Sequence, residues 1–336
     1  MRFILAFGII LIMYSCKDDR IFLKSEHGFP DSPTNLSIFN SEYDDYNSKL
    51  EPGVYDMYTL VFSSNRNSHG NDFDIVLFSL GMRYPFEEDV VSIYESSGVS
   101  GKYLHIRSMQ STINSSKNEY GPYIFNCNLN NDKFQEEFIF FYAREENNKL
   151  DIKYMINEGV LSENKTIRYK WTGPFDFNLV NTEENSEAYI SLNNDIVYYC
   201  SNDGGDYDIY QKNIPSDIDI IDFLSQTNDG INNPIVNINS GSDDKCPYII
   251  DDFMVFVSNR PGGLGGYDLW YSKLINNSWS KPINFGSPIN TKYDEYRPII
   301  VKYKDIRNDL MIFSSNRPGG FGGFDLYYIG IDETRY

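Results

Sequence analysis

Three kinds of residue in this sequence could support chemistry, but none has a spacing that identifies a reaction. The histidines are His27, His69 and His105, which lie far apart and follow no repeat. Ser-His-Asp catalysis needs a histidine placed between a nucleophile and an acid. Neither a GxSxG nor an HExxH sequence occurs in the chain. From the residues alone, we therefore expect a protein that is not an enzyme.

Acidic and glycine-rich segments raise two further possibilities, a calcium site and a phosphate site. Asp203, Asp206 and Asp208 carry oxygen ligands, but their spacing differs from the twelve-residue calcium loop with its terminal Glu. The glycines at 262–266 and 319–323 join two expected strands, with no following helix and no Gly-Lys-Ser/Thr. No Cys/His spacing typical of a metal site exists either. We expect neither a metal nor a cofactor.

These glycines belong to a phrase that the chain repeats, and the phrase predicts the elements around it. The sequence FVSNRPGGLGGYDLWY at 256–271 returns as FSSNRPGGFGGFDLYY at 313–328. An apolar run, a Gly-rich turn and a second aromatic run predict two strands joined by a tight turn. Weaker copies lie at 61–78, 138–154 and 197–210. A phrase that returns along a chain indicates one supersecondary unit used several times.

The Asp in the second strand of each copy sets the period. These residues are Asp74, Asp151, Asp208, Asp268 and Asp325, at steps of 77, 57, 60 and 57 residues. A short segment before each phrase indicates an inner strand, and a looser segment after it an outer strand. The pattern predicts an all-β propeller of five four-stranded blades. The longer first step leaves room between residues 80 and 120 for an extra hairpin or a degenerate sixth blade.

The ends of the chain predict how the ring closes. Eight residues follow Tyr328, so the last blade would lack its outer strand. The segment 33–39 precedes the first inner strand and could supply this strand. Pairing the two ends removes an exposed sheet edge. We expect residues 33–39 to pair with the strand at 324–331.

Polar residues of the repeated phrase are expected to stabilise its turn. Asn side chains cap turns by hydrogen bonds to backbone amides. An Asp within an apolar strand needs a partner, and we expect the Arg of the same phrase to pair with it, as Arg260 with Asp268. The expected turn residues are Asn65, Arg66, Asp74, Asn202, Asp208, Asn259, Arg260, Asp268, Asn316, Arg317 and Asp325.

The phrase SNRPGGxGGxDLxY resembles the TolB-like, WD-like β-propeller repeat of bacterial envelope proteins. The match is closest at 256–271 and 313–328, and the units together cover most of residues 30–336. The resemblance implies a five- or six-bladed propeller that works by protein contacts in the cell envelope. Family members often carry a peptidoglycan-binding OmpA-type domain, so the resemblance implies an envelope protein partner, such as an OmpA-type protein.

The N-terminal sequence predicts export and lipid attachment. Residues 3–13 form an apolar run of signal-peptide length that is too short to span a bilayer. Ser15-Cys16 resembles the end of a bacterial lipobox, which implies a signal peptide at 1–15, lipid on Cys16, a tether at 16–30 and a propeller at 31–336. Lys17, Asp18 and Asp19 resemble the surface-export signal of Bacteroidota lipoproteins. An ordinary secretory signal and a plain solvated tether are the alternatives.

Composition limits the partners. The formal net charge of −19 argues against nucleic acid and against docking on an anionic membrane surface. We therefore expect membrane attachment through the lipid anchor only. The 27 Tyr and 23 Phe are typical of a strand-rich protein. Besides Cys16 there are three cysteines, so at least one is unpaired and the chain is not a disulfide scaffold.

We expect an outer-membrane or cell-surface lipoprotein whose propeller binds protein in an envelope assembly. Propellers bind through loops held by a rigid scaffold. The loops with Tyr43 and Asp44, and with Tyr293, Asp294 and Glu295, have the aromatic and acidic character of a contact surface. Glycan binding is the alternative, because exposed aromatic rings stack on sugars, and a glycan-active propeller enzyme is the least favoured hypothesis.

Overall fold

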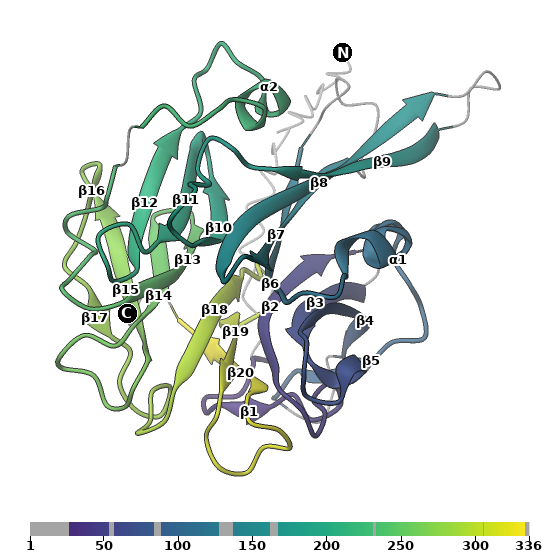
Figure 1. The fold of residues 1–336 in the computed structure, drawn as a ribbon. Coiled ribbons are helices and arrows are strands. Elements are labelled where there is room, and N and C mark those ends of the chain that lie inside the picture. Colours follow the sequence, from purple (N-terminus) through teal and green to yellow (C-terminus); the bar gives the residue numbers. More distant parts are fainter. Residues whose placement is uncertain are drawn as a thin grey trace, which may run out of the picture.

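The computed structural model describes residues 27–53, 57–83, 89–127, 137–161, 167–230, 233–304, 306–332 and 336. Within these residues, antiparallel sheets form five blades around one axis (Figure 1). This is the all-β, five-bladed propeller that the repeated phrase predicts. The expected signal peptide, the lipidated Cys16 and the export residues Lys17, Asp18 and Asp19 lie outside the described residues.

The blades follow one another along the chain, each running from an inner strand at the axis outwards. The first consists of β2 (Asp45–Pro52), β3 (Met57–Ser64), β4 (Asp74–Arg83) and β5 (Ser92–Glu95). The second consists of β6 (Glu119–Asn126), β7 (Phe138–Glu146), β8 (Lys149–Leu161) and β9 (Ile167–Asp176). The third consists of β10 (Glu187–Asn193), β11 (Ile196–Ser201) and β12 (Asp208–Asn213). The fourth consists of β13 (Asp244–Ile250), β14 (Phe253–Ser258), β15 (Asp268–Ile275), β16 (Ser278–Trp279) and β17 (Ile283–Asn284). The fifth consists of β18 (Glu295–Val301), β19 (Asp309–Ser315), β20 (Asp325–Ile331) and β1 (Thr34–Asn35).

The ring closes as the sequence predicts. In the fifth blade β1 pairs with β20, with Thr34 opposite Tyr328 and Asn35 opposite Tyr327. The two residues that anchor this segment, Leu36 and Phe39, are buried. Residues 28–30, at the end of the expected tether, also pack on the propeller, where the Phe29 amide donates to Asn308 Oδ1 over 2.7 Å. The N-terminal strand β1 therefore supplies the outer strand of the fifth blade.

The long first step is not a sixth blade. It contains β5 and then the helix α1 (Gly101–Ile113), which packs on β4 and β9 outside the ring (Figure 1). Ser100 caps the helix by accepting from the Tyr103 amide over 3.0 Å. Ile106, Met109 and Ile113 of α1 are buried, which fixes it to the first two blades. The remaining helical turns are η1 (Arg66–Ser68) and α2 (Ile220–Leu224).

Each inner strand carries the same irregularity. The register of β2, β6, β10, β13 and β18 slips after the second residue, which marks a β-bulge in every blade. The third residue then has a positive φ, and these residues are Asn47, Gly121, Tyr189, Cys246 and Arg297. A Tyr, Cys or Arg in this region is strained, and the surrounding fold must hold it there. The bulge lies at the same level in all five blades.

Side chains fill the axis below the bulges. Lys49 of the first blade lies over the rings of Tyr123 and Tyr248, with its ammonium nitrogen 5.1 and 5.2 Å from the ring centres. Glu51 pairs with Lys49 over 3.1 Å. Although burial acts to lower the pKa of Lys49, Tyr248 and Glu51 raise it overall. Lys49 is therefore charged, and this level of the axis is plugged.

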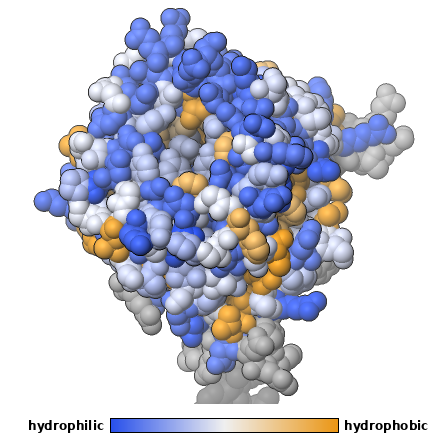
Figure 2. All heavy atoms as spheres, turned by 60° about the horizontal axis from the view of Figure 1, so that its bottom comes forward, coloured by the Kyte–Doolittle hydropathy of each residue, from blue (hydrophilic) through white to orange (hydrophobic). Residues whose placement is uncertain are grey.

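Hydrophilic side chains cover most of the face in Figure 2, and hydrophobic ones gather there in separate small patches. Among the exposed large hydrophobic residues are Leu264 and Phe321, at the tips of equivalent Gly-rich turns. In the part of the chain that the structure describes, every helix is too short or too polar to cross a membrane.

Candidate functional site

The repeated Gly-rich turns join neighbouring blades. The carboxylate of Asp325 accepts hydrogen bonds from the Phe321 and Gly322 amides, over 2.6 and 3.3 Å, and so caps the turn. A Cβ on Gly322 would lie 1.9 Å from the carbonyl oxygen of Tyr43 in the first blade. In the fourth blade, Gly265 makes the same approach to the Tyr293 carbonyl, at 2.2 Å. The glycines thus let each turn pack on the loop that enters the next blade.

The arginines of the phrase do not pair with the Asp of the phrase, which corrects the prediction. Arg66 donates to Asp45 over 2.6 Å, Arg317 donates to Glu295 over 3.0 Å, and Arg260 pairs with Asp244. Each of these acids is the buried first residue of an inner strand. In the fourth and fifth blades, Asp268 and Asp325 accept hydrogen bonds from amides of the turn instead.

The third blade lacks this ion pair. Its inner strand begins with Glu187, but Asp203 stands where the first, fourth and fifth blades have Arg66, Arg260 and Arg317. Glu187 accepts hydrogen bonds from Thr182 and Ser201 only. Because it is buried, its pKa is raised to about 7. Asp208, the expected turn residue of this blade, has a buried Oδ1 without a hydrogen-bond partner, and burial raises its pKa to about 6.

Two recurring positions bring aromatic rings to the propeller axis. One is the second residue of the inner strand, and the other is the residue before the Asp of the third strand. At four blade junctions, the next blade binds the backbone of the residue before the Asp. For example, Phe324 N donates to Asp44 Oδ1 over 2.8 Å, and Phe324 O accepts from Asp45 N over 2.8 Å. The seven rings form what we call the axial aromatic cluster: Tyr46, Phe73, Tyr120, Tyr207, Tyr267, Tyr296 and Phe324.

The rings of the axial aromatic cluster touch across blade boundaries. Tyr46 lies 5.0 Å from Phe73, 5.9 Å from Tyr120 and 5.8 Å from Phe324, between ring centres. Tyr296 lies 5.5 Å from Tyr267. All seven residues are half-buried. Burial, followed by the neighbouring Tyr189, raises the pKa of Tyr46, so its hydroxyl stays neutral and can donate.

Polar groups lie beside the rings on the fourth blade. Lys245 lies 4.3 Å from the ring centre of Tyr207 and pairs with Asp243 over 2.9 Å. The hydroxyl of Tyr267 donates to Asp243 and accepts from Lys245. Burial acts to raise the pKa of Asp243, but these donors and the Tyr207 amide lower it overall, so it is ionised. The cluster therefore combines aromatic faces with a fixed donor and acceptor set.

The expected contact loops have mainly structural roles. Asp44 and Asp294 accept hydrogen bonds from the Phe324 and Tyr267 amides, and Glu295 is fully buried. Tyr43 stacks on His69 with ring centres 6.1 Å apart. Of the expected turn caps, Asn65, Asn202 and Asn316 each accept from the loop that enters their own blade, as Asn316 Oδ1 does from the Asp294 amide over 2.8 Å. Two recurrences in the sequence could have indicated the aromatic cluster. An aromatic residue precedes the Asp in four of the five copies, and one follows the inner-strand acid in three of the five blades.

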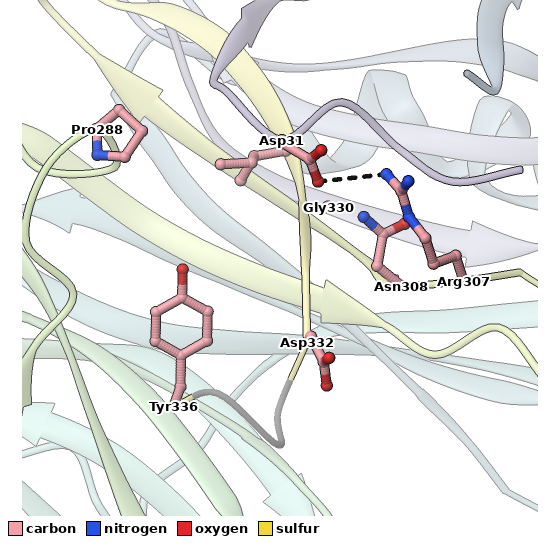
Figure 3. A pocket seen from close by; sticks show the side chains of 8 residues that line it. Asp31, Pro288, Arg307, Asn308, Gly330, Asp332 and Tyr336 are labelled. Atoms are coloured by element: carbon pink, nitrogen blue, oxygen red, sulfur yellow. Dashed lines mark hydrogen bonds and ion pairs between the residues drawn. The ribbon is translucent and has the colours of Figure 1, made fainter. Parts of the chain in front are cut away.

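Three cavities lie away from the axis. One of about 90 Å³ lies at the ring closure, where Arg307 pairs with Asp31 over 3.3 Å (Figure 3). Asn308 at the same place holds the backbone of Phe29, so this cavity belongs to the closure. Grooves of about 390 Å³ and about 330 Å³ follow the rim, beside Trp279 and beside α1. None of these three cavities is lined by a cluster of half-buried aromatic residues like the one at the axis.

Within the described residues, no group of three or more His, Cys, Asp or Glu side chains is arranged to hold a metal ion. Cys127, Cys200 and Cys246 are free thiols. Cys200 and Cys246 are buried, and the Cys246 amide donates to the sulfur of Cys200 over 3.1 Å. Burial raises the pKa of Cys246 to about 12, so this thiol is neutral.

Comparison with known proteins gives structural matches only. No protein-family model and no curated sequence matches the chain. An α-L-arabinofuranosidase from Podospora anserina in complex with cellotriose is 11% identical, over 91% of this chain and 98% of that chain, with a TM-score of 0.46. A protein of unknown function from Dyadobacter fermentans is 11% identical, over 90% and 98%, with a TM-score of 0.46. An α-L-arabinofuranosidase from Lactobacillus brevis is 9% identical, over 88% and 93%, with a TM-score of 0.47. At these identities the likeness concerns the fold alone.

These matches correct one expectation and leave another without support. We expected a protein that is not an enzyme, but the solved structures it matches include glycoside-cleaving enzymes. Two catalytic carboxylates that a fold brings together need no fixed sequence motif, so the lack of GxSxG and HExxH does not exclude an enzyme. None of the comparisons supports the TolB-like, WD-like identity or an envelope scaffold. The β-propeller is the part of that expectation that stands.

Proposed function

We propose that this protein binds glycans through the axial aromatic cluster. The observation that carries the proposal is the convergence of seven half-buried aromatic residues from all five blades on one axis, beside the Lys245–Asp243 pair. Ring faces stack on the apolar faces of sugars, and tyrosine hydroxyls, a lysine and a carboxylate bond to sugar hydroxyls. Ligand sites are typically aromatic surfaces with a few fixed polar groups.

The arrangement favours a glycan over a protein partner in an envelope assembly. Protein interfaces centre on large desolvated anchors that fill pockets of the partner. The rings of the axial aromatic cluster are instead held edge to face by one another, as Tyr296 is by Tyr267 at an interplanar angle of 86°. Such rings form a fixed platform instead of projecting as anchors. In the loops expected to contact protein, Asp44 and Asp294 accept structural hydrogen bonds from backbone amides instead.

A polysaccharide panel tests this function. The purified protein would be titrated with arabinan, β-1,3-galactan, cello-oligosaccharides and peptidoglycan fragments, with calorimetry as the readout. We expect saturable binding to at least one glycan. The same mixtures would be analysed for released sugars, because the fold is shared with glycosidases and turnover is measured directly. A panel without binding or turnover would contradict the proposal.

The first nineteen residues support a location for this activity. Their pattern is that of a lipid-anchored outer-membrane protein, with lipid on Cys16 and an export signal at Lys17, Asp18 and Asp19. Replacing Cys16 by Ala should release the protein from the membrane fraction, and replacing the three export residues should remove it from the cell surface. Labelling with a fatty-acid analogue and protease accessibility of whole cells are the measurements.

A further inference from the structure

Arg297 is a buried cation without a counter-charge. It is the third residue of β18, its side chain is 1% exposed, and it makes no ion pair in the described structure. Its Nε and Nη1 atoms have no hydrogen-bond partner, its Nη2 donates to the carbonyl of Pro122 over 3.4 Å, and the guanidinium also interacts with the Cys246 thiol. A guanidinium stays protonated in proteins, so the positive charge cannot be lost. Burying an unpaired charge is costly.

The groups around Arg297 do not supply a negative charge. Its guanidinium lies 5.2 Å from the ring centre of Tyr189. Burial raises the pKa of Tyr189 and of Tyr296 well above the ordinary value, and that of Cys246 to about 12. Both phenols and the thiol are therefore neutral at neutral pH. The aromatic face attracts the cation, but it does not replace a hydrogen-bonded anion.

The nearest charged levels of the axis are already paired. Above Arg297, Lys245 pairs with Asp243. Below it, Glu51 takes both Lys49 and Lys102, over 3.1 and 3.0 Å. One carboxylate thus serves two ammonium groups, and no acid remains for Arg297. These three lysines and two acids carry a net charge of +1, and Arg297 raises it to +2.

The level of Arg297 has further unsatisfied polar atoms and little space. Asn47 holds the equivalent place in the neighbouring first blade, and both polar atoms of its buried side chain lack partners. Gly121, in the second blade, lies so close to these groups that a side chain would not fit there. A Cβ there would lie 2.7 Å from the Tyr189 ring and 3.3 Å from Nη1 of Arg297. A site so enclosed suits a single-atom ion better than a sugar carboxylate or a phosphate.

We infer that the propeller axis binds a halide ion, chloride under physiological conditions, at the Nε and Nη1 atoms of Arg297. The ion supplies the missing negative charge and the hydrogen-bond acceptor. It lies beneath the axial aromatic cluster and joins blades that are not adjacent along the ring. The site is structural and does not depend on glycan binding.

Bromide tests the site directly. Crystals of the protein grown without chloride would be soaked in sodium bromide, and anomalous scattering would be collected at the bromine edge. An anomalous peak within hydrogen-bond distance of the Arg297 guanidinium is expected. Density there without an anomalous signal, or a peak elsewhere only, would overturn the inference in favour of a water molecule.

Thermal melting gives a second test with a matched variant. The melting temperature of the wild type should rise by a few degrees as chloride replaces gluconate at constant ionic strength, because an ion that binds only the folded state stabilises it. Arg297→Met keeps the length of the side chain and removes the charge, and its melting temperature should not change with chloride. Equal melting temperatures of the wild type in the two salts would overturn the inference, whether or not the variant folds.

Discussion

Arg317 donates to Glu295 over 3.0 Å across the fifth blade, with Glu295 wholly shielded from solvent. The guanidinium also stacks on Phe313 and Tyr327, at 5.2 and 5.0 Å from their ring centres. The third blade has the acid, Glu187, and a matching stacked ring pair, Tyr199 and Tyr210, at 5.7 Å. Asp203 takes the place of the arginine. The third blade therefore has the acid and the two rings that surround the arginine in the fifth blade, but it lacks the arginine.

Replacing Asp203 by Arg should stabilise the protein. The Asp203 amide donates to Ser201 Oγ over 3.2 Å, as the Arg317 amide does to Ser315 Oγ over 3.2 Å, so the backbone already has the required geometry. A charge-assisted hydrogen bond of this kind contributes about 1–2 kcal/mol. We expect the melting temperature at pH 7.5 to rise by about 2–4 °C. Asp206→Arg, with the same change of net charge in the same turn, is the control, and an equal rise there would refute the pairing.

Glu187 should make stability depend on pH. Its pKa rises from the ordinary 4.5 to about 7 in the folded protein, so the folded state keeps a proton that the unfolded chain releases between these values. The stability from this group is complete below about pH 4.5 and falls until about pH 7, by at most about 3 kcal/mol. Glu187→Gln should remove this fall. Urea unfolding from pH 4.5 to 8 measures it, and parallel curves for the two proteins would contradict the assignment.

Gly322 should be intolerant of a side chain. A Cβ there would meet the Tyr43 carbonyl at 1.9 Å, so Gly322→Ala forces the fifth blade away from the first. Overpacking of this kind costs about 1–3 kcal/mol. Gly241→Ala is the matched control, since nothing lies within 4 Å of its Cβ position and the residue is exposed. The unfolding free energies of the two variants should differ, and similar values would show that the turn can shift freely.

The closing segment should be essential for cooperative folding. Phe39 is buried and its carbonyl accepts from Arg66 over 2.6 Å, whereas Ile38 beside it is 48% exposed. Phe39→Ala should cost about 3–5 kcal/mol, and deletion of residues 36–39 should abolish the cooperative melt. Ile38→Ala should melt like the wild type. An unchanged melting temperature for Phe39→Ala would mean that the ring does not depend on this closure.

The blades could be predicted because their signals are local. The apolar run, the Gly-rich turn and the Asp lie close together in the sequence. The Asp begins the third strand in four of the five blades, as Asp268 does opposite Ser258. The prediction of an extra hairpin or a sixth blade between residues 80 and 120 missed the helix α1, although Ile106, Met109 and Ile113 have helical spacing. A search for a helical period would have found it.

The site could not be predicted, because it depends on how the blades meet. The arginine partners were missed because the acids that bind them, such as Glu295, lie outside the repeated phrase, at the first position of the inner strands. Aligning the units on that acid would have shown it. The contact of Tyr296 with Tyr189, at 6.2 Å across the axis, exists only once the ring is closed. The positive φ of Arg297 likewise has no signal in its own residue type.

The most direct test of the central claim compares two aromatic residues in one titration. Tyr267 belongs to the axial aromatic cluster, whereas Phe321 lies on a Gly-rich turn outside the cluster and is 60% exposed. Calorimetry with the glycan that the panel identifies would be run on Tyr267→Ala, Phe321→Ala and the wild type. We predict a loss of affinity of about tenfold or more, ~1.4 kcal/mol, for Tyr267→Ala alone. Unchanged affinity of Tyr267→Ala, or an equal loss in both variants, would contradict glycan binding at the axis.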